Sequence, residues 1–534
     1  MRVFRFCRTK PYMVPLTEVQ TISIGLREMD KQNFLFYGDN LDVLRKQIKD
    51  EVVDLCYIDP PFNSKRNYNQ IYNNIGTEDR AQAQAFTDTW VWDTHAITGF
   101  AEILANDFGR FQPKLVDLIG GLQSVLGRGS LLAYLVSIAL RVTEIHRTLK
   151  PTGVFFLHCD PTASHYLKLI LDAIFCPQGG DFRNEIAWCY SHGGKSKRWF
   201  GRKHDVILFY SKSDEYKFDP DAVRIEMRSG KKSFGGRLET DKDGRVYRLV
   251  YGTKNAKGET RYYKYYLDEG KLPEDWWTDI NSIQASSAER LGYPTQKPEA
   301  LLERLIKVCS EEGDTIIDAY CGCGTSIVVA EKLNRRWIGI DITYQSISLV
   351  LKRLEDELGE SALGKISLNG IPQDMDSARA LANKQDDRLR KEFEKWAVLT
   401  FTNNRAIINE KKGADSGIDG QAYFLTGKGD NAKIIFQVKS GGVKRADVAT
   451  LNGDMAREKA ALGVLITLEE PTKPMINEAK GAGQFWHETM AKNYDRIEIV
   501  TVRDIIEKGK RLDIPMSLEV LKKAASKQQD ELPF

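Results

Sequence analysis

The chain has 534 residues, of which 42% are hydrophobic and 28% charged, so it is long enough for two to four globular domains with their own cores. Its net charge of +3 points to no class of partner for the chain as a whole. No run of 18 uncharged apolar residues occurs, and the start lacks the apolar segment of a signal peptide, so we expect a cytoplasmic protein without a membrane span.

The first predicted strand covers residues 34–37 and runs into Gly38 and Asp39, ahead of a short helix over 41–49. Asp39 therefore follows the C-terminal end of a strand. Its carboxylate can accept a hydrogen bond from the adenine of a cofactor, or it can cap the N-terminus of the helix. The sequence leaves both alternatives open.

The next strand is predicted over 52–58, an apolar run that ends abruptly at Asp59, Pro60, Pro61 and Phe62. Such a run is typical of a buried parallel strand, and ligands bind at the carboxyl ends of such strands in open α/β sheets. The alternative is a strand end followed by a rigid turn.

These four residues suit the methylation of an exocyclic amine of adenine or cytosine, whose nitrogen is a poor nucleophile because its lone pair is delocalised into the ring. The carboxylate of Asp59 and the carbonyl of Pro60 can each accept one N–H hydrogen bond and so aim the lone pair outward. Proline adds no competing N–H group, and Phe62 would stack on a base flipped out of the duplex.

Strand and helix patterns alternate further along the chain, which is typical of a doubly wound α/β fold. Helices are predicted over 131–149 and 163–174, and strands over 154–158, 186–190 and 206–210.

The segment 211–291 breaks this alternation. Within the overlapping stretch 195–272, 20 Lys and Arg stand against 12 Asp and Glu, a net charge of +8, and aromatic residues are frequent. Basic residues in such numbers suit contacts with DNA phosphates, so we assign 211–291 to target recognition. A solvated loop region is the alternative.

A second ligand-binding motif begins where the alternation resumes. A strand ends at Asp318, and the turn that follows contains Gly322 and Gly324 ahead of a helix, so backbone N–H groups can approach a small ligand there. The next strand ends at Asp341, which can accept hydrogen bonds from both hydroxyls of a ribose. The pattern favours a cofactor that contains a nucleoside.

Together these motifs resemble the amino-directed DNA methyltransferases of the permuted (beta) class, in which the catalytic motif precedes the S-adenosylmethionine loop. The resemblance extends over about residues 30–360. It rests on Gly38-Asp39, Asp59-Pro60-Pro61-Phe62-Asn63, Pro294-Thr295-Gln296-Lys297-Pro298, Asp318-Ala319-Tyr320-Cys321-Gly322-Cys323-Gly324-Thr325 and Gly339-Ile340-Asp341.

This resemblance implies a doubly wound, seven-stranded, Rossmann-like sheet. The catalytic residues would be Asp59, Pro60, Pro61 and Phe62, and S-adenosyl-L-methionine would be bound by Asp39, Asp318, Tyr320, Gly322, Gly324 and Asp341. The family usually has Pro-Phe where this chain has Ala319-Tyr320, but an aromatic ring is retained. Asp rather than Ser before the two prolines favours adenine N6 over cytosine N4 as the target.

A second, smaller α/β domain is predicted beyond residue 366. Asp419 in a Gly-rich turn, followed about twenty residues later by Gln437 and Lys439 in a strand, resembles the restriction-endonuclease-like fold of the Mrr type, with Gln in place of the second acid. In such a nuclease site Asp419 and Gln437 would bind Mg²⁺, and Lys439 would stabilise the attacking water or the phosphate charge. The alternative is a DNA-binding or structural domain that does not cleave.

We therefore predict a site-specific DNA methyltransferase that methylates adenine N6 in double-stranded DNA, with an appended Mg²⁺-dependent nuclease domain, in restriction-modification or phage defence. The alternatives are cytosine-N4 methylation and a non-methylating DNA-binding component that senses modification. Its location would be cytoplasmic and nucleoid-associated. A homodimer, and a replication or defence protein bound by the acidic C-terminal tail, are further candidate assemblies.

The expected domains are a methyltransferase over 1–366, a linker over 367–385, a restriction-endonuclease-like domain over 386–515 and a flexible tail over 516–534.

Overall fold

The computed structural model describes most of the chain. Described are residues 25, 32–61, 66–71, 82–88, 90–190, 197–226, 237–254, 258–284, 287–291, 293, 295–372, 374–383, 387–403, 406–409, 417–426, 431–488 and 490–514. Phe62 and the predicted tail over 516–534 lie outside this part of the chain.

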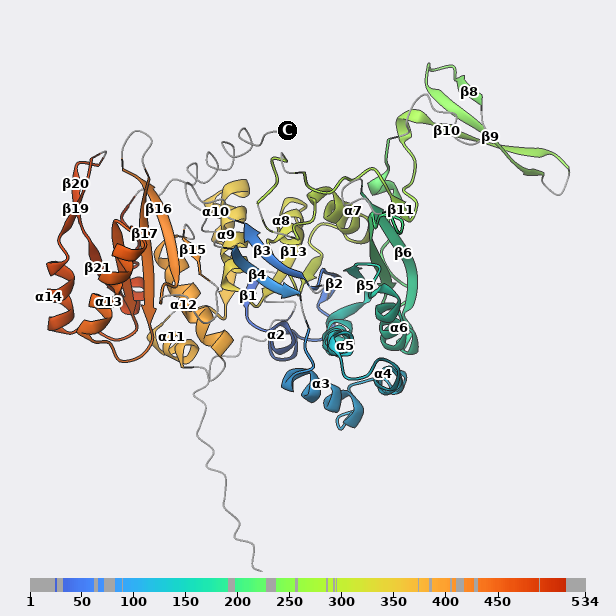
Figure 1. Cartoon of the computed structure of the whole chain (residues 1–534). Helices are drawn as coiled ribbons and strands as arrows, with labels where there is room; N and C mark the ends of the chain where they lie inside the picture. The colour runs from blue at the N-terminus through green and yellow to red at the C-terminus, as the bar shows by residue number, and fades with distance from the viewer. Residues whose placement is uncertain are drawn as a thin grey trace, which may run out of the picture.

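The largest sheet has nine strands among the described residues, in the order β11-β6-β7-β5-β2-β12-β13-β1-β14 (Figure 1). Neighbouring strands run parallel except where β7 pairs with β5 and β6. The strands are β1 (Asn33–Tyr37), β2 (Val53–Ile58), β5 (Leu149–Cys159), β6 (Asp181–Cys189), β7 (His204–Ser211), β11 (Trp276–Trp277), β12 (Thr315–Asp318), β13 (Arg336–Asp341) and β14 (Ile366–Asn369).

The predicted seven strands correspond to the run from β6 to β1, and one further strand is added at each edge. The sequence did not predict these two because β11 is only two residues long and β14 only four.

Helices cover both faces of this sheet, which confirms the doubly wound α/β fold. Alternate residues of β1 face opposite sides: Leu35 and Tyr37 join one core cluster, Phe34 and Phe36 the other. The first cluster is completed by α7 (Glu299–Cys309), α8 (Thr325–Lys332) and α9 (Tyr344–Leu358). The second is completed by α2 (Asn40–Gln47), α3 (Thr94–Ala105), α4 (Pro113–Leu126), α5 (Ser130–Thr148) and α6 (Ser164–Phe175).

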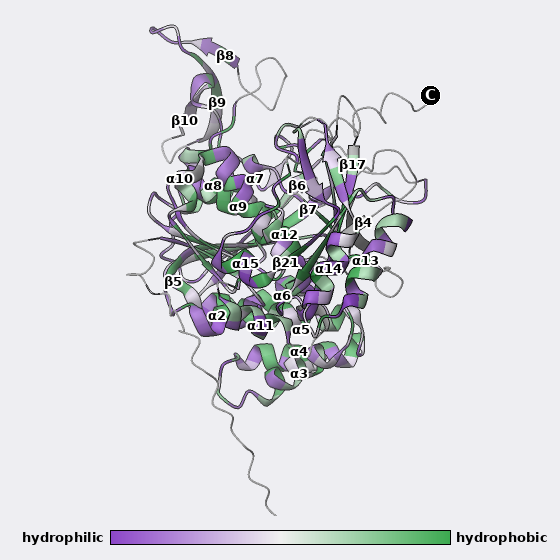
Figure 2. Ribbon diagram, turned by 90° about the vertical axis from the view of Figure 1, so that its left-hand side faces the viewer, coloured by the Kyte–Doolittle hydropathy of each residue, from purple (hydrophilic) through white to green (hydrophobic). Residues whose placement is uncertain are grey.

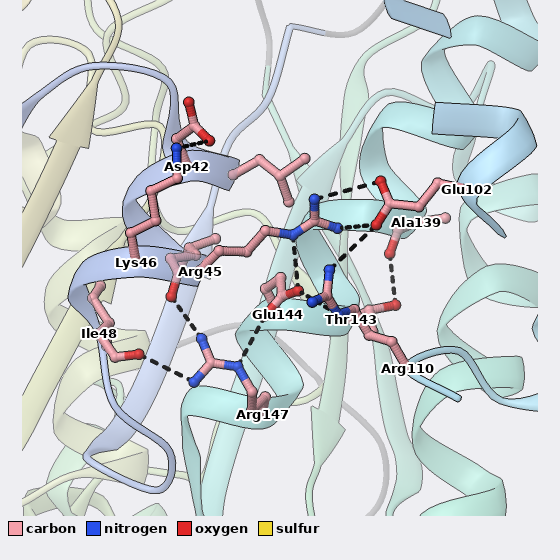
Figure 3. A network of polar contacts seen from close by, with 12 residues as sticks. Asp42, Arg45, Lys46, Ile48, Glu102, Arg110, Ala139, Thr143, Glu144 and Arg147 are labelled. Atoms are coloured by element: carbon pink, nitrogen blue, oxygen red, sulfur yellow. Dashed lines mark hydrogen bonds and ion pairs between the residues drawn. The ribbon is translucent and has the colours of Figure 1, made fainter. Parts of the chain in front are cut away.

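A network of charged side chains fixes α2 against its neighbours (Figure 3). Arg45 of α2 contacts Glu102 of α3 at 2.6 Å and Glu144 of α5 at 3.0 Å. Glu144 is only 3% exposed and also pairs with Arg147 at 2.9 Å and Arg110 at 3.5 Å, so three guanidinium groups compensate its buried charge. The network therefore holds the last turn of α2, where Arg45 lies, against α3 and α5.

A separate three-stranded antiparallel sheet projects from the body within the predicted recognition region (Figure 1). It consists of β8 (Arg237–Thr240), β9 (Val246–Lys254) and β10 (Thr260–Tyr266). Its strands carry four tyrosines that are 47–66% exposed: Tyr251, Tyr262, Tyr263 and Tyr265.

The predicted second α/β domain is present. Its five-stranded sheet has the order β15-β16-β17-β18-β21. The strands are β15 (Ile407–Ile408), β16 (Gly420–Leu425), β17 (Asn431–Lys439), β18 (Leu462–Thr467) and β21 (Ile497–Thr501), with a hairpin of β19 (Gln484–His487) and β20 (Lys492–Asp495). The helices are α12 (Asp387–Phe401), α13 (Arg445–Arg457), α14 (Lys473–Gly481) and α15 (Val502–Glu507).

The stretch predicted as a linker, 367–385, proves to be mostly regular structure. Its first residues complete β14, which pairs with β1, and α11 (Met375–Ala382) packs against α12 and α15. Side chains of β1, α9, α12 and β17 belong to one continuous hydrophobic cluster. The two domains are therefore joined by a shared core rather than by a free connection.

Hydrophobic residues gather in the central strands, and hydrophilic ones on the outward faces of peripheral helices such as α2 (Figure 2). None of the described helices is long and apolar enough to cross a membrane. The remaining elements are the pair β3 (Arg66–Ile71) and β4 (Gln82–Asp88), α10 (Glu360–Leu363), and the short helices η1 (Cys176–Gln178), η2 (Pro220–Val223) and η3 (Leu267–Glu269).

Candidate active site

The predicted catalytic and cofactor motifs meet at one edge of the large sheet. Strands β2, β12, β13 and β1 are parallel neighbours, so their carboxyl ends lie side by side. Ile317 pairs with Cys56 on one side and with Ile338 on the other, and Tyr37 pairs with Asp341. The residues that follow these strands therefore face one region.

Asp59 follows β2 and forms an ion pair with Lys297, which lies two residues before α7. The two side chains are only 15% and 9% exposed. The backbone carbonyl of Lys297 accepts a hydrogen bond from the hydroxyl of Thr325 at 3.3 Å, and Thr325 begins the helix after the glycine turn. Lys297 thus links the catalytic motif to the cofactor motif.

The other residues of the catalytic motif continue the chain after Asp59. Pro60 is buried and Pro61 is half-buried. The sequence did not predict Lys297 as a site residue, although it lies within the motif Pro294-Thr295-Gln296-Lys297-Pro298 that supports the resemblance. That position in the motif was the signal that could have identified it.

A buried chain of polar groups lies next to Asp59 on the same face of β2. The hydroxyl of Tyr57 is 3.0 Å from Nδ1 of His158, and Nε2 of His158 is 3.1 Å from Asp205. Asp205 also accepts a hydrogen bond from the hydroxyl of Tyr190 at 3.0 Å. Although burial opposes it, bonding to His158 holds the pKa of Asp205 below its ordinary value. With Asp205 ionised, Nε2–H of His158 donates to it, and Nδ1 is then the acceptor of a hydrogen bond from the Tyr57 hydroxyl.

The glycine turn after β12 requires glycine at two positions. Gly322 and Gly324 have φ of +49° and +75°, which other residues adopt at a cost. A Cβ at Gly324 would also lie 2.7 Å from Cγ2 of Val350, so the turn packs closely on α9. The N–H of Gly322 donates to the carboxylate of Asp341 at 2.9 Å. The turn and the end of β13 therefore form one unit.

Asp318 is 3% exposed at the end of β12. Its carboxylate accepts a hydrogen bond from the N–H of Tyr320 at 2.9 Å and one from the hydroxyl of Ser326. Burial raises the pKa of Asp318 to about 7 despite these bonds, and the charges of Asp59 and Asp341 add to the shift. In this structure Asp318 holds the turn together.

Asp341 lies at the end of β13. One oxygen accepts from Gly322, and the other accepts from the N–H and the hydroxyl of Thr343, both at 2.9 Å. Burial raises the pKa of Asp341 in spite of these bonds. A carboxylate so fixed at a strand end presents a preorganised acceptor.

In the structure Asp39 caps the N-terminus of α2. Its carboxylate accepts from the N–H of Leu41 at 2.8 Å, and its second oxygen pairs with Arg141 at 2.9 Å. The side chain remains 40% exposed. The amide of Asn40 donates to the carbonyl of Ala319 at 2.7 Å, which ties α2 to the segment that carries Tyr320. Tyr320 packs against the second core cluster.

The residues predicted for the nuclease site lie together in the second domain, but their contacts are structural. Asp419 accepts a hydrogen bond from the N–H of Val438 at 2.7 Å, and the amide of Gln437 donates to the carbonyl of Gly417 at 2.6 Å. Lys439 ends β17.

This donor set does not fit Mg²⁺, which prefers several oxygen ligands with carboxylates among them. One carboxylate is engaged by the backbone and the second acid is replaced by Gln437. Within the described ranges, no three His, Cys, Asp or Glu side chains are arranged to hold a metal ion. The predicted Mg²⁺ site is not supported.

Comparisons with known proteins cover both domains. Residues 53–352, more than half of the chain, match the N6_N4_Mtase family model, described as "DNA methylase". Residues 389–507 match a family described as "NACHT-associated inactive Restriction Endonuclease 1". The word "inactive" in that description runs against the predicted nuclease.

Curated relatives are methyltransferases. The chain is 29% identical over 226 residues to the type II methyltransferase M.BglII of Bacillus subtilis, covering 41% of this chain and 56% of the relative. It is 25% identical over 323 residues to the DNA adenine methyltransferase YhdJ of Escherichia coli K12, covering 60% and 82%. The chain thus spans just over half the length of the first relatives it matches, at 56% and 57%.

Among solved structures, the PvuII DNA methyltransferase, described as cytosine-N4-specific, aligns with 14% identity and a TM-score of 0.36 over 64% of this chain and 95% of that one.

Proposed function

Because this chain belongs to the DNA methylase family whose model matches residues 53–352, we propose that it transfers a methyl group from S-adenosyl-L-methionine to an exocyclic amine of a base in double-stranded DNA. The observation that carries this proposal is the position of Lys297, which pairs with Asp59 and whose carbonyl bonds Thr325 after the glycine turn. A base at Asp59 and a cofactor at the turn would be neighbours.

On the side of the base, the carboxylate of Asp59 and the carbonyl of Pro60 accept the two N–H bonds of the amine and turn its lone pair outward. The ion pair with Lys297 fixes the orientation of the Asp59 carboxylate. Phe62 would stack on the flipped base. Asp before the two prolines favours adenine N6, and cytosine N4 is the competing target.

On the side of the cofactor, the residues fit a nucleoside with a charged tail. Asp341 would accept from the ribose hydroxyls, and the backbone around Gly322 and Gly324 would approach the ligand where side chains would clash. Asp39, Asp318 and Tyr320 border the same region. When bound, S-adenosyl-L-methionine supplies an electrophilic methyl group on a sulfonium.

The order of the motifs supports assignment to the permuted (beta) class, because the Asp59 strand β2 precedes the glycine turn in the chain. We propose a methyltransferase unit that ends near residue 366. Relatives named as type II methyltransferases support a role in restriction-modification or phage defence.

The sheet β8–β10 supports target recognition by the region 211–291. Arg248, Lys254 and Arg261 lie on β9 and β10, which also carry the exposed tyrosines, and Arg237 lies on the neighbouring β8. Lysine and arginine would contact phosphates, and a subset of side chains would contact base edges in a groove.

We propose that the second domain keeps a restriction-endonuclease-like fold, of the Mrr type, without cleaving DNA. Its matched family is described as inactive, the amide NH2 of Gln437 donates to the carbonyl of Gly417, and one carboxylate oxygen of Asp419 accepts from the N–H of Val438. DNA binding and support of the first domain are the roles left to it.

The test incubates the full chain with labelled S-adenosyl-L-methionine and unmethylated genomic DNA, with and without Mg²⁺. Mass spectrometry of the digested DNA is expected to find N6-methyladenine, and gels are expected to find no strand breaks. N4-methylcytosine would change the target base. Absence of any methylated base would favour a DNA-binding component that only senses modification. Breaks that depend on Mg²⁺ would contradict a non-cleaving second domain.

A further inference from the structure

A carboxylate of the second domain reaches the edge of the first domain where the cofactor motifs meet. Helix α12 packs against α9, the helix that begins three residues after Asp341. Glu392 of α12 is directed into this contact and is only 8% exposed. Burial of a carboxylate costs free energy unless donors satisfy it, so its partners show what it is there to hold.

Those partners belong to the first domain on two sides of the cofactor motif. One oxygen of Glu392 accepts from the hydroxyl of Tyr37 at 3.3 Å and from the N–H of Tyr344 at 3.2 Å. The other oxygen pairs with Lys395 of its own helix at 2.8 Å. Burial and the Glu392 charge raise the pKa of Tyr37, so its hydroxyl keeps its proton and donates.

Both donors are adjacent to predicted cofactor residues. Tyr37 is the last residue of β1, it pairs with Asp341 across the sheet, and it comes two residues before Asp39. Tyr344 is the first residue of α9, next to the Thr343 that bonds Asp341. One carboxylate from the second domain therefore braces the two segments that flank Asp341.

Further contacts hold the same arrangement. The rings of Tyr37 and Tyr344 pack edge to face with centroids 6.1 Å apart, and the hydroxyl of Tyr344 is 2.9 Å from that of Thr400, also on α12. Without Glu392, a buried hydroxyl and an N–H at the start of a helix would lose their acceptor.

We propose that Glu392 is a positioning residue of the cofactor site, so that the second domain is a working part of cofactor binding. It acts through Tyr37 and Tyr344, which set the geometry around Asp341. This inference rests on the proposed function and extends it to the second domain. By linkage, bound cofactor would in turn strengthen the contact between α12 and α9.

The experiment compares the full chain with Glu392→Ala, Glu392→Gln and Glu458→Ala. The amide oxygen of Gln keeps an acceptor for both donors. Glu458 is the matched control, because its partner Lys433 lies 2.8 Å away within the second domain. Calorimetry measures the Kd for S-adenosyl-L-methionine, and hydrogen exchange measures protection of the amides over residues 341–350.

Glu392→Ala is expected to weaken cofactor binding about tenfold, which is the effect expected when a buried donor loses its acceptor. Exchange at the start of α9 should quicken in the same variant. Glu392→Gln should stay within about threefold of the wild type, and Glu458→Ala should match it.

Unchanged Kd and unchanged exchange in a folded Glu392→Ala would overturn the inference, as would an equal loss in Glu458→Ala. A wild type that binds no S-adenosyl-L-methionine would instead refute the proposed function. The exchange measurement would still decide whether Glu392 positions the segment around Asp341.

Discussion

Replacement of Lys297 by Met tests the link between the two motifs. Met has a similar length but no charge, so the carboxylate of Asp59 would lose its cation while remaining only 15% exposed. Removal of one partner from a buried ion pair costs about 3–5 kcal/mol, because the other charge is left uncompensated. Partial access of water to Asp59 places the expected loss near the lower limit, at about 3 kcal/mol.

Urea unfolding followed by circular dichroism measures this loss. The two single variants Asp59→Asn and Lys297→Met, together with their combination, form a double-mutant cycle. The double variant leaves no uncompensated charge, so it should be more stable than Lys297→Met alone by about 2 kcal/mol. The reasoning would be refuted if Lys297→Met unfolded within about 0.5 kcal/mol of the wild type, or if the double variant lost the sum of both single losses.

Other substitutions test the rest of the site. Because the folded-state pKa of Asp318 is about 7, the folded protein holds this proton more tightly than the unfolded chain, so the free energy of unfolding should fall as pH rises from about 4 to 7 and level off above. Asp318→Asn should remove this pH dependence, which amounts to about 3 kcal/mol in the free energy of unfolding between pH 5 and 8. Urea unfolding measures it, and the same pH dependence in the wild type and the variant would contradict the prediction. Gly324→Ala, with φ of +75° and a contact at 2.7 Å, should lose about 2–3 kcal/mol and weaken cofactor binding, and an unchanged Tm and Kd would show that the turn has room. Asp205→Asn should lower kcat without changing the Kd for cofactor, because it removes the charge that orients His158. A kcat equal to that of the wild type would leave the hydrogen-bonded side chains Tyr57, His158 and Asp205 a purely structural role.

The fold of the first domain could be predicted where local pattern decides it. The strand predicted over 52–58 is β2 at 53–58, and the strand predicted over 34–37 is β1 at 33–37, because both are continuous apolar runs. The edge strand β14 and helix α11 were missed because they are short, at four and eight residues, and are stabilised by pairing and packing with distant elements.

The candidate site was predictable in its strand-end carboxylates, because parallel strands bring their carboxyl ends to one edge. The partner of Lys297 is 238 residues away, so its position in the motif 294–298 was the only local signal for it. Glu392 was missed because its partner Tyr37 is 355 residues away and no local pattern signals that contact. Gln437 in place of a second acid was a signal in the sequence, because it leaves fewer carboxylates than a Mg²⁺ site prefers.

Methyl transfer by wild type and Asp59→Ala, measured beside calorimetric binding of S-adenosyl-L-methionine, tests the central claim most directly. The account predicts a methylated adenine in DNA treated with the wild type, none with the variant, and the same cofactor Kd for both proteins. Equal methylation by Asp59→Ala, or loss of cofactor binding together with activity, would contradict the division of labour between Asp59 and the glycine turn.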